Sequence, residues 1–583
     1  MPSAEKKTMT LPTPPHLSRR PRRTAAWLTA GLAVTLLAGP NLPAGAAPTD
    51  PVPPGADLIV PGPADPGTPR PGGYLDPIQD HSSIDTATYA ALSVTEELPR
   101  TYDLRQLGVV PPVRDQGRFG TCWAFAATGS AMVRLALDGH PGVQLSPAHL
   151  IYSVYNLLGV LQWRSDAGQT RFVNPLNDGG TQSTAAAAWS KWYGAQTEAA
   201  YPYSSATQAV LLANVQTSAY HLRDAWSYPR PLVDGQLDPA NLDEIQRGLM
   251  QEGALTLSYY ADTASQVGLR SATYNPATAA VYNKAPKSAN HAVLVVGWDD
   301  DYPAANFTTN PDPDGSGPAT GNGAWLVQNS WGATWGNAGY FWLSYFDASV
   351  ANDSIYSYDL IPAAEDTVDH VLFLDDGPPT WSVQPGAWAG AGTFVANVLS
   401  VPRTGSDQAL RAVMVYFADP QMSYGISVYK DPTAGPTSGT LVDVSAGDGT
   451  AQTGHVSHAG WQRVELDQPV TLPAGSKVAV VVQLTNLANP AATDAAYESS
   501  VAMATSTDYA KTFVTASPGQ SYRSGDGVTW TDFGAAQGAN WSIKALTSDQ
   551  TQRLGLVMDA LSASLGIVLA VLVTRLLTTF PAG

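Results

Sequence analysis

Cys122 is the only cysteine in the 583 residues, so its thiol cannot form a disulfide within the chain. By itself it also cannot supply the ligands of a tetrahedral zinc site. Three roles remain open: a buried spectator, an intermolecular bridge or a reactive nucleophile. Gly117 and Gly120 permit a tight turn before the thiol, and the Ala-rich run at 122–137 predicts a buried helix. The positive end of a helix favours thiolate over thiol, which favours the nucleophile.

A thiolate that attacks a carbonyl needs hydrogen-bond donors for the developing oxyanion, and a base that takes its proton. Gln116 offers a side-chain amide six residues before the thiol, and the backbone N–H of Cys122 offers a second donor. Among nine histidines, only His291 stands at the start of an apolar run, residues 292–296, which predicts a buried strand. Such a strand is a rigid mount for a base, although a packed or solvated histidine fits the same position.

A third group is needed to orient the base. Asn329 follows a second predicted strand at 324–327, and its amide oxygen can accept a hydrogen bond from an imidazole N–H. Trp331, two residues further on, can shield that bond from water. We therefore expect the helix that carries the thiol to face the strand that carries the imidazole.

Residues 98 to 345 resemble the papain-like cysteine peptidase family. The segments DQGRFGTCWAF, NHAV and QNSWGATWGNAGY resemble its nucleophile, histidine and asparagine segments, and LSPAHLIY, NDGGTQSTAAAAWSKWYG and EAAYPY resemble further landmarks. The resemblance implies an α+β, two-lobed catalytic domain with a helical lobe and a β-barrel-like lobe. It implies catalytic roles for Cys122 (nucleophile), His291 (base and acid), Asn329 (orienting group) and Gln116 (oxyanion donor), and substrate-binding roles for Gly179, Gly180, Ala289 and Trp331.

The same resemblance predicts that Cys122 and His291 form a thiolate–imidazolium pair, with no cofactor and no catalytic metal. Phe119 stands where relatives commonly carry a disulfide cysteine, and the whole framework of bridges is absent. We therefore expect the fold to be held by packing alone, or with calcium or another aid. An acidic surface loop at 299–323 only faintly resembles a calcium loop, so a solvated insertion is favoured.

The rest of the chain divides by composition. Short β-rich runs between Gly/Pro/Asp turns predict an all-β antiparallel sandwich after the catalytic domain, and these runs resemble a lectin-like domain of prokaryotic secreted proteins. A basic run followed by an apolar run and small residues predicts a secretory signal. The predicted parts are a signal peptide (1–47), a Pro/Gly-rich linker or short prosegment (48–97), the peptidase domain (98–362), the lectin-like sandwich (363–547) and an apolar C-terminal helix (548–583).

The net charge of −18 argues against a nucleic-acid partner. The C-terminal segment 561–577 has one charge, and both a membrane anchor and a packed helix fit it. Trp461 and Trp530 could stack on a sugar bound to the sandwich, although such residues more often lie in a core. We expect a secreted or surface-attached cysteine endopeptidase acting on proteins or peptides. The alternatives are a catalytically inert surface binding or adhesion protein, and a transpeptidase that uses the same thioester.

Overall fold

The structure is a computed structural model. It describes residues 97–157, 162–164, 170–172, 175–177, 179–205, 218–262, 271–307, 319–352, 354–374, 381–383, 393–403, 405–447, 449–487, 495–498, 502–504, 509–511 and 516–550. The predicted signal peptide, nearly all of the predicted linker and the tail after residue 550 lie outside these ranges. Within them, no helix has both the length and the apolar character needed to cross a membrane.

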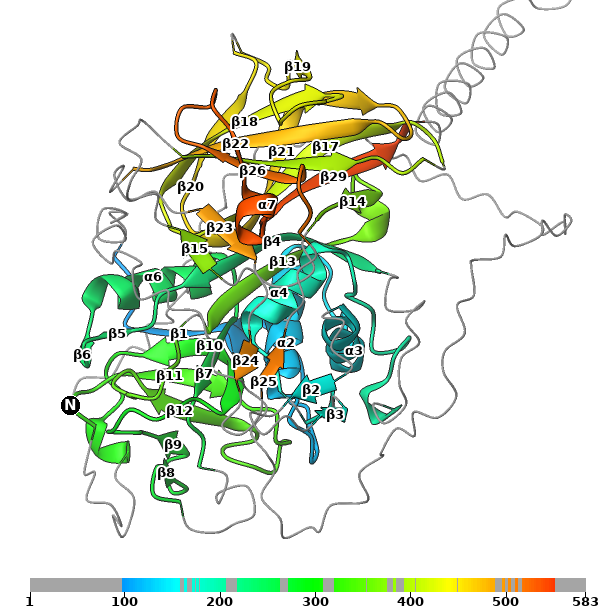
Figure 1. Ribbon diagram of the computed structural model, residues 1–583. Coiled ribbons are helices and arrows are strands. Elements are labelled where there is room, and N and C mark those ends of the chain that lie inside the picture. Colours follow the sequence, from blue (N-terminus) through cyan, green and yellow to red (C-terminus); the bar gives the residue numbers. More distant parts are fainter. Residues whose placement is uncertain are drawn as a thin grey trace, which may run out of the picture. The chain divides into compact units, whose positions relative to one another are not determined.

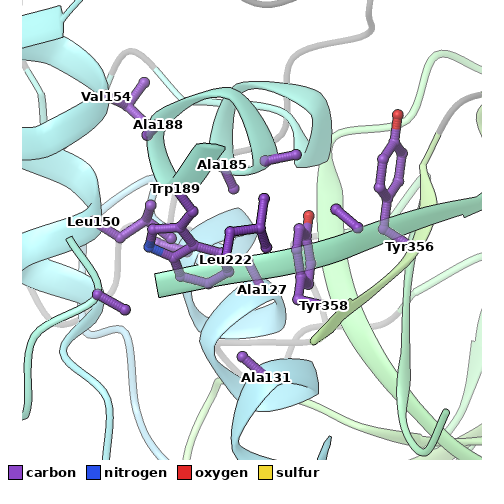
Figure 2. Packing of buried hydrophobic residues seen from close by; sticks show 14 of the residues in the cluster. Ala127, Ala131, Leu150, Val154, Ala185, Ala188, Trp189, Leu222, Tyr356 and Tyr358 are labelled. Atoms are coloured by element: carbon purple, nitrogen blue, oxygen red, sulfur yellow. The ribbon is translucent and has the colours of Figure 1, made fainter. Parts of the chain in front are cut away.

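Three helices form the first lobe of the catalytic domain: α2 (Cys122–Leu137), α3 (Pro147–Leu157) and α4 (Gln182–Ser190). Their alanine-rich faces let large side chains such as Trp189 pack closely between helices, as Figure 2 shows. Helix α4 begins with a capping box between Thr181 and Thr184. The predicted helix at 122–137 is confirmed with both of its ends.

A seven-stranded sheet forms the second lobe, in the order β1–β10–β11–β12–β9–β8, with β7 also paired to β10 (Figure 1). Its central strand β10 is buried along eight of its nine residues, as its apolar sequence predicts. Helix α6 (Pro239–Gln251) follows the β5–β6 pair. The strands are β1 (Thr101–Asp103), β5 (Leu232–Val233), β6 (Gln236–Leu237), β7 (Leu255–Tyr259), β8 (Tyr274–Asn275), β9 (Ala280–Val281), β10 (His291–Asp299), β11 (Ala324–Gln328) and β12 (Tyr340–Ser344).

An all-β domain follows, as predicted. Its first sheet runs β13–β4–β21–β17–β29–β14, and its second runs β19–β18–β22–β16–β26–β27, with β20 also paired to β18. The bounds are β4 (Tyr220–Tyr228), β13 (Ile355–Pro362), β14 (His370–Leu372), β16 (Thr393–Ser400), β17 (Gln408–Phe417), β18 (Met422–Lys430), β19 (Thr440–Val442), β20 (Gln452–Val456), β21 (Ala459–Leu472), β22 (Lys477–Asn486), β26 (Ser521–Ser524), β27 (Thr531–Asp532) and β29 (Ile543–Asp549). Valine-rich strands of both sheets pack against each other and form a separate hydrophobic core.

The smaller elements complete the fold. Two further sheets run β15–β23–β28 and β24–β25–β2–β3, and the second of them joins strands of both domains. Their strands are β2 (Gln162–Arg164), β3 (Thr170–Phe172), β15 (Trp381–Val383), β23 (Ala495–Glu498), β24 (Ala502–Ala504), β25 (Tyr509–Lys511) and β28 (Asn540–Trp541). The short helices are η1 (Leu104–Leu107), η2 (Tyr203–Ser205), η4 (Ala304–Phe307), η5 (Ala363–Glu365) and α7 (Phe533–Gln537).

The first sheet of the sandwich crosses the predicted domain boundary. Strands β4 and β13 belong to the catalytic part of the sequence, yet β4 pairs with β21 through partners such as Ala225 and Trp461. Gly460 makes this approach possible, since its φ is +113° and a Cβ there would lie 2.1 Å from the Ala225 carbonyl oxygen. The two domains therefore share one hydrogen-bonded sheet.

The two domains also share a hydrophobic core. Trp461 and Met414 of the sandwich are fully buried in the same cluster as Cys122, Trp189 and Tyr358 of the catalytic domain. Of the two roles that the sequence left open for Trp461, stacking on a sugar is wrong and a place in the core is confirmed, because the whole side chain is buried where the two domains meet.

Candidate active site

The nucleophile candidate is the first residue of α2. Cys122 is fully buried, and the side chain of the preceding N-cap residue, Thr121, makes no capping hydrogen bond. Gly117, with φ of +64°, supplies the turn that the sequence predicts before the thiol. The sulfur Sγ accepts a hydrogen bond from the backbone N–H of Ala292 at 3.3 Å. Since Ala292 directly follows His291, helix and strand bring the thiol beside the imidazole residue.

Strand pairing brings the imidazole to its orienting group. In the antiparallel β10–β11 pair, Leu294 lies opposite Gln328, so the start of β10 meets the end of β11. The His291 Nε2 atom lies 2.8 Å from Asn329 Oδ1. This oxygen also accepts the backbone N–H of Ser330 at 2.7 Å.

These bonds define the tautomer of His291. A backbone N–H can only donate, so the Asn329 atom that faces the Ser330 N–H must be the amide oxygen. The same oxygen must then accept from His291, which places the imidazole hydrogen on Nε2. Nδ1 therefore carries a lone pair, and within the described residues it has no hydrogen-bond partner although it is buried. Such an atom can take a proton from a thiol.

Trp331 covers the His291–Asn329 pair. Its indole stacks on the imidazole with ring centroids 4.4 Å apart and an interplanar angle of 28°. Trp335 packs edge-on against Trp331 at 4.9 Å. The indole thus excludes water from the hydrogen bond that orients the base, as expected from the sequence.

Burial lowers the pKa of His291 to about 4, and the hydrogen bond to Asn329 opposes this shift only in part. An isolated imidazole at this position is therefore neutral at physiological pH. A neighbouring thiolate would raise the pKa again by stabilising the imidazolium, so the predicted ion pair depends on the negative charge of Cys122. Among the described residues, no cluster of His, Cys, Asp and Glu side chains could hold a metal ion.

Three hydrogen bonds hold the backbone N–H and the side-chain amide of Gln116 in place. Its backbone N–H donates to Ser330 O at 2.8 Å, its Oε1 accepts from Ser330 Oγ at 2.7 Å, and its Nε2 donates to Phe119 O at 2.7 Å. A backbone carbonyl can only accept, so the amide orientation is defined. Nε2 carries two hydrogens, and the bond to Phe119 uses one. The second can serve an oxyanion. Ser330 was not predicted from the sequence, although its position next to Asn329 was an available signal.

The substrate-binding candidates lie around this centre. Gly180 packs against the indole of Trp123, where a Cβ would lie 2.4 Å from the ring. Gly179 has φ of +81°, and its carbonyl accepts a hydrogen bond from Tyr155 at 2.6 Å. Ala289 is buried in the hydrophobic cluster that contains Cys122. A side chain at Gly180 would have to displace the indole of Trp123 in the helix that bears the thiol, and at Gly179 the positive φ disfavours a side chain.

The fold and this site define the class of the protein as a cysteine peptidase with a second, all-β domain. Residues 98–358 match the family model described as papain family cysteine protease, and residues 383–547 match the model described as lectin like domain. Over residues 98–358 the chain is therefore similar to the papain family of cysteine proteases, and over residues 383–547 it is similar to lectin like domains. Both resemblances seen in the sequence, and the predicted fold class, are confirmed.

Several known proteins are similar. A cysteine protease of Blomia tropicalis is 26% identical over 287 residues, which are 48% of this chain and 71% of that protein. Mouse cathepsin K is 28% identical over 244 residues, 42% of this chain and 59% of cathepsin K. The chain thus spans little more than half of most such relatives. A solved structure of the cysteine protease and lectin-like domains of Cwp84, a surface layer associated protein of Clostridium difficile, matches 78% of this chain and 90% of that chain at 24% identity, with a TM-score of 0.59. This likeness supports the two-domain fold.

Proposed function

We propose that this protein is an extracellular cysteine endopeptidase that hydrolyses peptide bonds through Cys122, His291, Asn329 and Gln116. The observation that carries the proposal is that the thiol, the imidazole and the Asn329 amide lie next to one another in the required order. The thiol contacts the residue after His291, the imidazole presents Nδ1, and Asn329 holds Nε2. A buried spectator cysteine would need none of them.

In the first half-reaction, the thiol proton passes to His291 Nδ1, and the resulting thiolate Sγ attacks the peptide carbonyl carbon. The oxyanion accepts hydrogen bonds from the second Nε2 hydrogen of Gln116 and from the Cys122 N–H. The carbon–nitrogen bond then breaks as His291 returns the proton to the leaving amine. A thioester remains on Cys122.

In the second half-reaction, His291 Nδ1 takes a proton from water, and the hydroxide attacks the thioester. The same donors hold the second oxyanion, and the carbon–sulfur bond breaks to release the acid and the thiol. Asn329 keeps the ring oriented in both halves, and Trp331 keeps water from that hydrogen bond. Gly179, Gly180 and Ala289 line the bound peptide.

The extracellular location is proposed on two grounds: the predicted signal peptide at 1–47, and the printed description of Cwp84 as a surface layer associated protein. Carbohydrate binding by the lectin like domain is not part of the proposal. It rests on the name of that domain, and Trp461, one of its two candidate aromatic residues, is buried.

The test is a peptide-library digest with the full chain and its Cys122→Ala variant. The wild type should cleave internal bonds and the variant should cleave none, while both unfold at the same temperature. Equal cleavage by both proteins would exclude the thiol mechanism. An added amine nucleophile separates hydrolysis from transpeptidation, because a transpeptidase would yield mainly amine adducts. A wild type that cleaves nothing would favour the inert binding protein.

A further inference from the structure

Tyr203, in the short helix η2, contacts both ends of the segment 116–121 that links Gln116 to the thiol. Its hydroxyl donates a hydrogen bond to the Gln116 carbonyl at 2.8 Å and lies 2.6 Å from Thr121 Oγ1. This tyrosine lies in the segment EAAYPY, which resembles a segment of the family. It takes no part in the two half-reactions of the proposed mechanism.

The direction of each hydrogen bond follows from counting hydrogens. Burial raises the pKa of Tyr203 well above its usual range, so the phenol keeps its hydrogen. A carbonyl oxygen has none to offer, so this hydrogen goes to Gln116. The Thr121 hydroxyl must then donate to the Tyr203 oxygen. The three groups form one chain of hydrogen bonds, Thr121 to Tyr203 to Gln116.

The side chain of Thr121 is directed to Tyr203 and does not cap α2. Threonine at an N-cap commonly accepts a hydrogen bond from an amide of the first helical turn. Here the hydroxyl of Thr121 contacts Tyr203, and no side-chain cap forms. The backbone amides of Ala124 and Phe125 donate instead to the Thr121 carbonyl oxygen.

Tyr203 is itself held firmly. Its ring packs edge-on against Phe125 of α2, with centroids 4.7 Å apart. Its backbone N–H donates to Glu198 Oε1 at 2.7 Å, and the other oxygen of Glu198 pairs with Arg114 at 2.8 Å. Arg114 in turn precedes Gln116 by two residues. The tyrosine therefore ties the helix, the oxyanion segment and its flanking residue to one another.

We propose that Tyr203 is a positioning residue that holds Gln116 at the distance from Cys122 that the oxyanion requires. The proposal rests on the proposed peptidase function. Tyr203 does not touch the substrate; it acts through the Gln116 carbonyl. The backbone carbonyl and the side-chain amide of Gln116 belong to the same residue. If the carbonyl were free to move, the amide donor would therefore move away from its place beside the oxyanion.

The first experiment replaces Tyr203 by Phe in the full chain, which removes the hydroxyl and keeps the ring against Phe125. Loss of one hydrogen bond of ordinary strength predicts a fall in kcat of about 5- to 10-fold with KM nearly unchanged. Tyr201→Phe is the matched control. The Tyr201 ring packs against His149 in a tilted contact and its backbone carbonyl accepts a hydrogen bond from Ser146, and both contacts survive the change. The control should keep wild-type kcat.

The second experiment combines Tyr203→Phe with Gln116→Ala. If the tyrosine acts through the Gln116 amide, it has nothing left to position in that background, and its effect on kcat should shrink to less than about 2-fold. An unchanged 5- to 10-fold effect would contradict the proposal. So would full wild-type activity of the single Tyr203→Phe variant.

Alkylation of the only thiol by iodoacetamide separates positioning from a damaged fold. This displacement develops no oxyanion, so the rate at Cys122 should be the same in the wild type and in Tyr203→Phe. A matching loss of alkylation would overturn the proposal in favour of a structural role. If the wild type cleaves no peptide at all, the peptidase function fails. If the wild type cleaves and Tyr203→Phe cleaves equally well, only the positioning role fails.

Discussion

The molecule contains two buried polar clusters of opposite design. The catalytic cluster consists of neutral side chains, and each of its hydrogen bonds has one defined donor and one defined acceptor. Its members are Gln116, His291, Asn329 and Ser330. The second cluster, which we call the domain joint, lies where β4 and β13 meet β21 and consists of Arg223, Asp224, Asp359, Asp366, Arg463 and His221. The first is organised to hold one proton in place. The second is organised to hold two domains together.

The domain joint is dense in charge. Asp224 and Asp359 stand directly opposite each other on β4 and β13, although like charges in register oppose pairing. Asp359 pairs with Arg223 at 2.8 Å, and Asp224 accepts the backbone N–H of Arg463 at 2.9 Å. Arg463 also pairs with Asp366 at 2.8 Å. Residues of the catalytic part, such as Asp224, thus find hydrogen-bond partners in the sandwich, such as Arg463.

Burial acts on both clusters but with opposite signs. It lowers the pKa of His291 to about 4, and it raises the pKa of Asp224 to about 6 and that of Asp359 to about 7. As long as Cys122 is uncharged, the unfolded chain therefore binds more protons than the folded one at His291 between pH 4 and 6.5. At the two carboxyls the folded chain binds more, from pH 3.8 upwards. Stability from His291 is lost as pH falls, and stability from the joint is lost as pH rises through 6 to 7.

The largest contrast is expected from two histidine replacements. His291→Ala should lower kcat about 100- to 10,000-fold, the usual contribution of a general base, with little loss of stability. His221→Ala removes the 2.8 Å partner of Asp366 at the joint. It should lower the free energy of unfolding by about 1–3 kcal/mol and leave kcat per folded molecule unchanged. Steady-state kinetics and urea titration of both variants decide whether the clusters have separate tasks. A His221→Ala enzyme with intact stability and poor kcat would reverse the assignment.

Trp461→Ala tests whether the domains unfold as one. The fully buried indole lies in the core shared by both domains, so its loss should cost about 3–5 kcal/mol. Because one sheet joins the domains, peptidase activity and the circular dichroism of the sheets should be lost in a single transition. Val528→Ala is the control, since Val528 is 79% exposed and should change nothing. A peptidase domain that keeps its activity after the sandwich melts would show two independent units.

Asp359→Asn tests the sign of the joint's pH dependence. In the wild type, the melting temperature should fall between about pH 4 and 7, because the carboxyls of the unfolded chain ionise there while the buried ones still hold their protons. The variant has no proton to lose at this position, so its melting temperature should change less over the same interval. Melting curves at half-unit pH steps measure the two slopes. Parallel slopes would show that Asp359 does not titrate in this range.

The smallest effect is expected at the surface. Arg100 and Asp301 form an ion pair between the start of the catalytic domain and the turn after β10, with Nε and Oδ2 at 2.7 Å. Both side chains are mostly exposed, so solvent and salt screen the pair. Arg100→Ala should leave the melting temperature and kcat within experimental error. A clear destabilisation would mean that exposed and buried ion pairs in this chain are equivalent.

The sequence predicted the elements that carry the site better than it predicted how they are held. The apolar run after His291 and the alanine-rich run after Cys122 are local signals, and both elements formed where expected. No local signal predicted the pairing of β4 with β21. The two strands are more than 200 residues apart, and the sequence of each is typical of any strand. A separation of 87 residues likewise hid the contact of Tyr203 with Gln116. Side-chain contacts across an interface depend on packing that no local pattern records.

The most direct test of the central claim is the titration of His291 by NMR, in the wild type and in Cys122→Ala, with the resonance assigned by substitution. In the variant, only burial and the opposing hydrogen bond to Asn329 act, and the imidazole should titrate near pH 4. In the wild type, the thiolate should stabilise the imidazolium and move the apparent pKa above its ordinary value of 6.5. Equal pKa values in the two proteins would show that Cys122 and His291 do not act as a pair.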